Sequence, residues 1–293
     1  MSDNNNQLVD CVRNRKFDFV KYVTINRAPI DSNTFISIVM TTHNRKEQTL
    51  HTLQTFNQSK LATQIIVILI DDSSEDFISD IELKMFKFQI THITIDPCKK
   101  YWINPCVNYN IGFMEVQTDQ IIVQNAEVLH CGDVIQYVHN HLTTRNYLVF
   151  DVRSVGDIDT KSTHVNHEIY VLNGYNMIAP YLEHRQYQWY QHSQKINRNF
   201  HFLTAITREN LMKLGGFAYE FAMGSCFDDN GLIHGIQHIL GLEIHNVINE
   251  TTHLMGVHQW HSRDPLSYNS QYHHHNHEIW LHRAFYQNLT SHN

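Results

Sequence analysis

Cysteine, basic charge and long apolar runs are all scarce in this chain of 293 residues. Its five cysteines are scattered and form no C-x-x-C pair, which argues against a disulfide framework or a zinc ribbon and favours a reducing compartment. The formal net charge of −7 argues against a general nucleic-acid binder, which would need a basic face. No apolar stretch approaches the roughly 18 residues of a transmembrane helix, and the polar start lacks a signal-peptide core. These absences predict a cytoplasmic protein with no transmembrane segment and no nucleic-acid partner.

A buried strand that ends in two carboxylates is the most informative feature that is present. The apolar run Ile65–Ile70 is typical of a strand buried on both faces of a parallel sheet, and Asp71 and Asp72 follow it directly. Open parallel sheets bind their ligands in the crevice beyond the carboxyl ends of the strands. The pair therefore predicts a site for a nucleotide, a metal or both. The alternative is a solvated acidic turn that caps the next helix.

Strands and helices alternate along the first half of the chain. The patterns predict strands at 35–42, 65–70, 89–95, 121–123 and 147–152, with helices at 44–56, 77–86, 105–114 and 133–142 between them. Asn44 and Glu47 have the spacing of a capping box for the first helix. Residues 153–200 are loop-rich, and shorter elements follow them. This order predicts an α/β fold with a Rossmann-like, mostly parallel central sheet flanked by helices.

Five short motifs stand at predicted strand or helix edges between residues 35 and 262. They are Ile38–Arg45 (IVMTTHNR), Ile70–Ser74 (IDDSS), Asn110–Gly112 (NIG), Asn125–Glu127 (NAE) and Gly215–Phe217 (GGF) with the pair Asp228–Asp229 downstream. Their order resembles that of the family 2 glycosyltransferases of GT-A fold. The resemblance implies a metal-dependent enzyme that transfers one sugar from a nucleotide-diphosphate sugar, with a UDP-sugar as the first guess by family frequency alone. Inversion of the anomeric centre is expected, because no second carboxylate stands out as a nucleophile.

The resemblance also implies a role for each matching position. Asp229, or with less support Asp228, would be the catalytic base that takes the proton of the acceptor hydroxyl. Glu127, His258 and His261 would hold Mn²⁺ or Mg²⁺, which stabilises the diphosphate leaving group as a Lewis acid. The donor contacts would be Thr41, His43, Arg45, Asp72, Asn110 and Asn125, and the acceptor contacts would be Trp189, Tyr190 and His192.

One departure from the family pattern keeps a further function open. Asn125-Ala126-Glu127 carries one carboxylate where the family usually has Asp-x-Asp, so metal binding is expected to be weaker. The same loss favours a catalytically inactive GT-A-like module that binds glycans or nucleotides. A nucleotidyltransferase is a further alternative. An enzyme of that class should begin with a glycine-rich phosphate loop. The turn after the first predicted strand has no glycine, which counts against this alternative.

We expect four parts along the chain. Residues 1–33 would be an N-terminal arm, 34–135 the nucleotide-sugar-binding half of a single GT-A domain, 136–262 the acceptor-binding half with the catalytic base, and 263–293 a polar, His-rich C-terminal tail. The expected partners are the donor and a glycan, protein or lipid-linked acceptor. A peripheral position at a membrane and a homodimer are left open.

Overall fold

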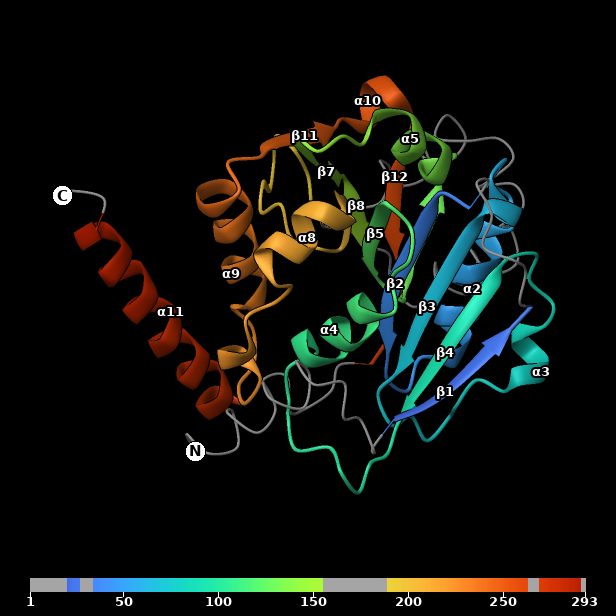
Figure 1. The fold of residues 1–293 in the computed structure, drawn as a ribbon, viewed down its shortest axis with the longest axis horizontal. Helices are drawn as coiled ribbons and strands as arrows, with labels where there is room; N and C mark the ends of the chain where they lie inside the picture. The colour runs from blue at the N-terminus through green and yellow to red at the C-terminus, as the bar shows by residue number, and fades with distance from the viewer. Residues whose placement is uncertain (1–19, 27–33, 155–188, 263–268, 291–293) are drawn as a thin grey trace.

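The computed structural model of the chain describes residues 20–26, 34–154, 189–262 and 269–290 (Figure 1). A large mixed sheet runs through the centre of these residues, and helices cover both of its faces. Strands β2, β3, β4 and β5 are parallel to one another, whereas β1 and β10 are antiparallel to their neighbours. The predicted α/β fold with a mostly parallel central sheet is confirmed.

The described strands form two sheets. The larger has the spatial order β1 (Val20–Ile25), β4 (Gln89–Ile95), β3 (Ile65–Asp71), β2 (Ile36–Thr42), β5 (Gln120–Asn125), β10 (Leu203–Thr207), β7 (Asn146–Phe150) and β11 (Glu243–Val247). The smaller has the order β6 (Val128–Cys131), β12 (Met255–His258), β8 (Val152–Ser154) and β9 (Trp189–Gln191).

The helices follow the strands in the expected alternation. They are α2 (Lys46–Phe56), η1 (Ala62–Gln64), α3 (Asp80–Leu83), α4 (Cys106–Met114), α5 (Val134–His141), α8 (Arg208–Leu214), η2 (Tyr219–Phe221), α9 (Asp228–His234), η3 (Gly235–Ile239), α10 (Asn249–Thr252) and α11 (Ser270–Thr290). Figure 1 shows α4 in front of the sheet and α2 behind it.

The core consists of two apolar layers, one on each face of the large sheet. Alternate residues of one strand enter different layers, since successive side chains of a strand point to opposite faces. In β3, for example, Val67 packs in the layer that contains Phe56 of α2, whereas Ile68 packs in the layer that contains Ile111 of α4. Burial on both faces explains why the run Ile65–Ile70 is apolar throughout. The polar residues Asp71 and Asp72 follow only where the strand ends, at the carboxyl edge of the sheet.

The structure differs from the sequence-based expectations in local detail. The predicted capping box of α2 is wrong: Arg45 occupies the N-cap without a side-chain bond, and Asn44 instead accepts a hydrogen bond from the main chain of Glu75 at 2.8 Å. The sequence patterns also missed β1, which lies within the predicted arm and pairs with β4, and the whole smaller sheet. A helix, α11, occupies most of the predicted polar tail. The division of the domain into a donor half and an acceptor half stays a prediction.

Among the residues that the structure describes, no helix combines enough length with enough apolar character to cross a membrane.

Candidate functional site

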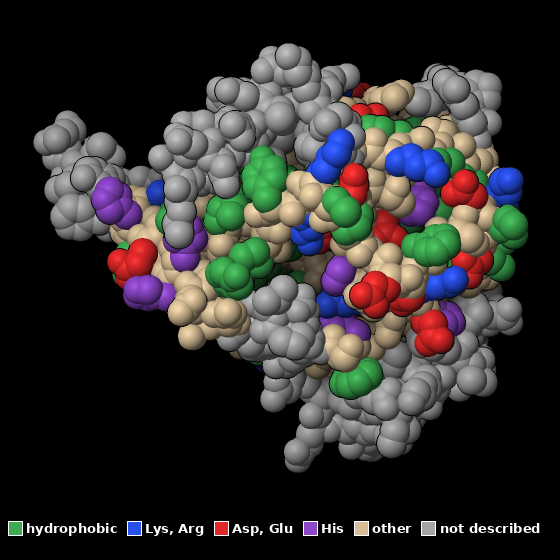
Figure 2. Space-filling view, turned by 90° about the horizontal axis from the view of Figure 1, so that it is seen from below, with side chains coloured by type: hydrophobic (Ala, Val, Ile, Leu, Met, Phe, Trp, Pro, Cys, Tyr) green, Lys and Arg blue, Asp and Glu red, His purple; other side chains and the backbone are tan. Residues whose placement is uncertain are grey.

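Three parallel strands bring the predicted donor residues to one edge of the large sheet. Thr42 at the end of β2 is paired with Asp71 at the end of β3, and Thr41 is paired with Asn125 at the end of β5. The carboxyl ends of these strands therefore lie side by side, where α/β sheets bind ligands. Figure 2 views the molecule from below, toward this edge, and shows charged and histidine side chains around a hollow in the middle of that face.

The acidic end of β3 lies in a polar turn next to the end of β2. Nδ1 of His43 lies 2.6 Å from the main-chain oxygen of Asp72. One carboxylate oxygen of Asp72, Oδ2, forms a 2.7 Å ion pair with Lys100. The other, Oδ1, is buried and has no hydrogen-bond partner within the described part of the chain. A buried oxygen of this kind is an acceptor that a bound ligand can satisfy.

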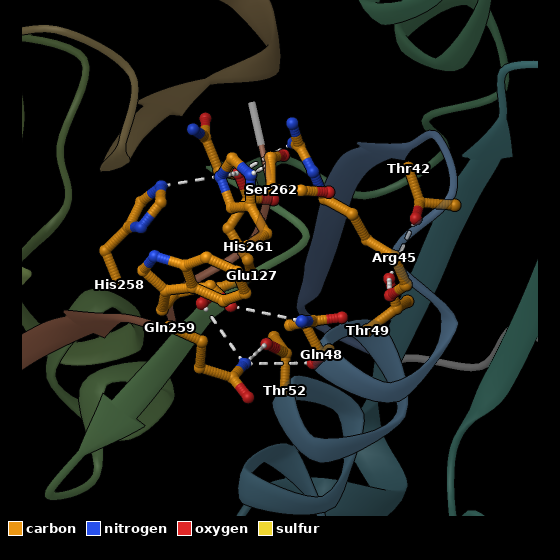
Figure 3. Close-up of polar contacts among 12 residues, drawn as sticks. Thr42, Arg45, Gln48, Thr49, Thr52, Glu127, His258, Gln259, His261 and Ser262 are labelled. Atoms are coloured by element: carbon orange, nitrogen blue, oxygen red, sulfur yellow. Dashed lines mark hydrogen bonds and ion pairs between the residues drawn. The ribbon is translucent and has the colours of Figure 1, made fainter. Parts of the chain in front are cut away.

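Glu127 is the centre of a second polar cluster, one turn beyond β5 (Figure 3). Its Oε1 lies 2.9 Å from NH1 of Arg45 and 3.3 Å from Nε2 of both His258 and His261. Glu127 is 2 % exposed, so its charge is compensated by these neighbours and scarcely by solvent. The cluster unites residues from the start of α2, the turn after β5 and the end of β12.

The small sheet explains how residues so distant in sequence meet. β12 pairs antiparallel with β6, and this register sets His258 opposite Val128, the residue after Glu127. The main-chain nitrogen of Gln259 then donates to the oxygen of Glu127 at 3.0 Å. The side chain of Gln259 also donates to the main chain of Gln48 at 3.0 Å, which ties the 258–261 segment to α2 (Figure 3).

The electrostatics of the cluster keep Glu127 ionised. Burial by itself would raise the pKa of this carboxyl, because it disfavours the charged form. The Arg45 charge and the hydrogen bonds from His258 and His261 outweigh burial and hold the pKa of Glu127 well below its ordinary value. An ionised carboxylate at neutral pH is the form that binds a cation.

The donor set of this cluster fits a divalent cation. The ligand atoms of Glu127, His258 and His261 all lie within 4.8 Å of one another. One carboxylate oxygen and two imidazole nitrogens suit Mn²⁺ better than Mg²⁺, which prefers oxygen ligands alone. Arg45 contacts the same oxygen of Glu127, so the guanidinium and a cation would compete for it.

A third polar cluster surrounds the aspartate pair at the start of α9. Asp228 is buried and accepts a 3.0 Å hydrogen bond from the side chain of Asn104. Oδ1 of Asp229 is contacted by Nδ1 of His201 and, at 3.1 Å, by the main-chain nitrogen of the same residue. The two carboxylates thus have different partners, and the side chain of Asp229 is the more exposed, at 18 %.

Burial and neighbouring charges shift the pKa values of Asp228 and His201. Burial, followed by the neighbouring charge of Asp229, raises the pKa of Asp228 to about 6. Burial of His201 opposes its charged form, but the negative charges of Asp229, Asp228 and Glu127 outweigh it and raise the pKa of the imidazole. The cluster therefore combines a buried carboxyl with a shifted pKa and a more exposed carboxylate held by a histidine.

The Glu127 cluster and the aspartate pair face the same region. The main-chain nitrogen of Asn125 donates to the oxygen of Phe202 at 3.3 Å, which sets His201 beside the end of β5. His201 in turn contacts Asp229. The charges of Glu127 and of both aspartates act on His201 and on the buried Tyr109, whose pKa is raised well above its ordinary value by burial and then by Glu127. The chain thus brings together three of the acidic residues singled out from the sequence.

The predicted acceptor residues lie on or near β9, in the smaller sheet. The ring of Tyr190 stacks on His258 at 4.1 Å, which connects this strand to the Glu127 cluster. Trp189 is half-buried, with Arg153 4.8 Å and Lys195 5.4 Å from its ring. His192 is fully buried, and its Nδ1 accepts a hydrogen bond from the main-chain nitrogen of Gln194 at 3.0 Å. Tyr190 therefore borders the site. Trp189 lies next to it in β9 and contacts Arg153 and Lys195, whereas His192 stabilises a turn.

Asn110 is not brought to the site. Its side-chain oxygen accepts from the main-chain nitrogen of Phe217, and its nitrogen donates to the oxygen of the same residue, both at 2.8 Å. A Cβ on Gly216 would lie 2.3 Å from that side-chain oxygen. Asn110 therefore holds the Gly-Gly-Phe turn against α4, a structural role that the sequence did not distinguish from donor binding.

Sequence reasoning missed three polar residues of the site, Lys100, Asn104 and His201. None belongs to a motif with a characteristic spacing, and each is recognised only through its partner, Asp72, Asp228 and Asp229 respectively.

Comparisons with known proteins identify the family and the fold. Residues 37–213 match the model of a family described as glycosyl transferase family 2. A search of curated proteins found no match. Among solved structures, Staphylococcus aureus TarS (residues 1–349, in complex with UDP-GlcNAc) is 9% identical with a TM-score of 0.56, and the match covers 80% of this chain and 61% of that one.

A mannosyltransferase from Pyrobaculum calidifontis, in complex with GDP-Man and Mn²⁺, is 14% identical with a TM-score of 0.46, and the match covers 86% of this chain and 63% of that one. This chain thus spans less than two thirds of the length of these solved structures.

Proposed function

Because the chain belongs to glycosyl transferase family 2 and has a GT-A fold, we propose that it is an inverting, metal-dependent transferase of single sugars at the carboxyl edge of its large sheet. The donor would be a nucleotide-diphosphate sugar and the acceptor a hydroxyl group. The observation that carries the proposal is that Glu127 follows the end of β5, and that His201, which holds Asp229, lies beside the same strand end.

The nucleoside of the donor would bind at the ends of β2 and β3. Asp72 offers a buried, unsatisfied oxygen there among the described residues, and His43 fixes the main chain of the same residue. Thr41 and Asn125 are paired across the neighbouring strands and complete this edge. UDP is the first candidate nucleotide, in line with the UDP-GlcNAc that is bound to TarS.

The diphosphate would lie toward Glu127. Glu127, His258 and His261 would hold Mn²⁺ there, and the bound cation would stabilise the negative charge of the leaving group. Arg45, which contacts Glu127 in the structure, would then lie next to the diphosphate, and the geometry of its guanidinium group matches that of phosphate oxygens.

Asp229 would take the proton of the acceptor hydroxyl. Its carboxylate is more exposed than that of Asp228, and His201 orients it through two contacts. A positioned general base contributes typically about 10²–10⁴-fold to the rate. With the base and the leaving group at opposite sides of the anomeric carbon, the hydroxyl attacks from the face opposite the diphosphate and inverts the centre. Trp189 and Tyr190 would form a wall of the acceptor site.

The activity can be tested by release of nucleotide from a panel of UDP-, GDP- and TDP-sugars in the presence of Mn²⁺. We expect turnover with one of them and its loss in Asp229→Asn, with nucleotide binding retained. Glu209→Gln is the matched control, because Glu209 lies in an exposed pair with Lys213 on α8. Unchanged turnover in Asp229→Asn would remove this residue from the role of base.

One observation favours a second function, a nucleotide- or glycan-binding protein without transfer activity. The single carboxylate of the Asn-Ala-Glu motif is already neutralised by Arg45 in the structure. A protein of this kind would bind UDP in a thermal-shift assay and would release no nucleotide from any sugar donor.

The position in the cell, the acceptor and the division into a donor half (34–135) and an acceptor half (136–262) are proposals as well. The cytoplasmic location, with peripheral contact to a membrane, can be tested by fractionation of the native protein. A glycan, a protein and a lipid-linked sugar are the acceptor classes to compare once a donor is known.

A further inference from the structure

Helix α11 packs against the segment that leads into the aspartate pair. It lies beyond the residues that match the family, 37–213, and at the edge of the molecule next to α9 (Figure 1). The main-chain nitrogen of Ser225 donates to the oxygen of Tyr272 at 3.1 Å. Asn276, one turn further along α11, is fully buried in this contact although it is polar.

Asn276 bridges the two ends of that segment. Its side-chain nitrogen donates to the main-chain oxygen of Phe221 at 3.0 Å and to that of Cys226 at 2.9 Å. Both protons of the amide are therefore used on carbonyl groups five residues apart. A Cβ on Gly224 would lie 2.2 Å from the side-chain oxygen of Asn276 and 2.6 Å from the oxygen of Tyr272, so only glycine permits this approach.

The bridged segment contains a strained turn. Cys226 and Phe227 both have left-handed backbone conformations, with φ of 63° and 66°, which are uncommon for residues other than glycine. Such conformations persist where the surroundings hold them in place. The ring of Phe227 lies 5.1 Å from that of His273 and 5.3 Å from that of His277, both on α11. The next residue in the chain is Asp228.

We propose that Asn276 is a positioning residue for the aspartate pair: by clamping the carbonyl groups of Phe221 and Cys226 it fixes the left-handed turn that aims Asp228 and Asp229. The catalytic consequence rests on the proposed function, whereas the positioning itself does not. Asn104 also holds this turn, because its side-chain nitrogen donates to Asp228 at 3.0 Å and to the main-chain oxygen of Cys226 at 3.5 Å.

The test is Asn276→Asp, a change of nearly equal shape. A carboxylate cannot donate to the two carbonyl groups and is repelled by them. Asn269→Asp, just before the same helix, is the matched control, because the side-chain oxygen of Asn269 accepts from the main-chain nitrogen of Gln271 and an aspartate oxygen can do the same. We expect kcat of Asn276→Asp to fall by about 10- to 100-fold, as misplaced catalytic groups do, with the KM for the donor within about twofold of the original. The control should keep its kcat.

A second readout is independent of turnover. The imidazole of His201 can be followed by NMR in histidine-labelled protein, with its signals assigned through His201→Asn. In the unmodified chain we expect a titration above the ordinary range, and in Asn276→Asp a shift back toward that range, because Asp229 has moved away. If the chain has no transferase activity, this titration still decides the role of Asn276.

The proposal is overturned if Asn276→Asp folds and leaves both the His201 titration and kcat unchanged. If that variant does not fold, Asn276→Ser, which shortens the side chain without adding charge, is measured with the same two readouts and the same deciding outcomes.

Discussion

Both the ring Nδ1 and the main-chain nitrogen of His201 contact a single carboxylate oxygen of Asp229. His201 comes from the segment before β10, and Asp229 belongs to the first turn of α9. Because β10 lies next to β5, this contact fixes the proposed base at a set position relative to the end of the central sheet. A carboxylate that is held in this way needs little reorganisation before it accepts a proton.

The first prediction concerns this contact. His201→Ala should lower kcat by about 10- to 100-fold, because Asp229 loses its orienting partner. His201→Asn should retain most of the activity, since the amide nitrogen can replace Nδ1 as a donor to the carboxylate. Steady-state kinetics of both variants with one donor makes the comparison. Equal activities of the two variants would show that the hydrogen bond is not what matters.

The second prediction concerns stability and pH. Folding raises the pKa of Asp228 from 3.8 to about 6, so the native state binds more protons than the unfolded state between these values. The free energy of unfolding therefore falls as pH rises through this window. Above pH 6 the buried Asp228 is ionised, and its full destabilising effect is reached. Asp228→Asn, which keeps the acceptor for Asn104, should raise the free energy of unfolding at pH 8 by about 1–3 kcal/mol.

At pH 3.5 the same substitution should change the free energy of unfolding little, because the carboxyl is then mostly protonated in both states. Urea unfolding at the two pH values measures the difference. A destabilised variant at pH 8 would contradict the shifted pKa.

Much of the donor side could be predicted from sequence, because it depends on local patterns. The run Ile65–Ile70 is buried on both faces, as its apolar character indicates, and a strand of this kind must present its acidic end at the sheet edge. The left-handed cap of α8 at Gly215 likewise agrees with its sequence pattern.

The remainder of the site depends on long-range pairing. His258 reaches Glu127 only because β12 pairs with β6, and short strands of this kind have no distinctive periodicity. The contact of His201 with Asp229 depends on the insertion of β10 between β5 and β7. The sequence His273–His277 in α11 is polar and therefore indicates an exposed tail. The residue of this stretch that is buried, Asn276, is itself polar, so no hydrophobic pattern indicates that the helix packs here.

The third prediction concerns the competition for Glu127. Arg45→Met should lower the Kd for Mn²⁺, measured without nucleotide, by about 3- to 10-fold, because a partly buried ion pair of this kind is worth about 1 kcal/mol. Arg145→Met is the control, since Arg145 is exposed in the loop before β7. Titration calorimetry gives both constants. Weaker Mn²⁺ binding in Arg45→Met would mean that the cation does not use this oxygen.

The fourth prediction separates the two glycines of the Gly-Gly-Phe turn. Both have left-handed φ, 81° at Gly215 and 76° at Gly216, so alanine strains the backbone similarly at each position. Only at Gly216 would the new Cβ collide with the side chain of Asn110. Gly216→Ala should therefore be less stable than Gly215→Ala by about 1–3 kcal/mol. Equal midpoints in urea would show that Asn110 is not in this contact.

The most direct test of the account is a crystal soaked with Mn²⁺ and UDP, measured with anomalous scattering. We expect manganese on Glu127, His258 and His261, and the nucleoside at the ends of β2 and β3 beside Asp72. Two histidines of α11, His274 and His277, form a separate group with Glu278, and their ligand atoms lie close enough to bind a metal. Manganese found only in that group, or UDP bound away from the carboxyl edge of the sheet, would contradict the account.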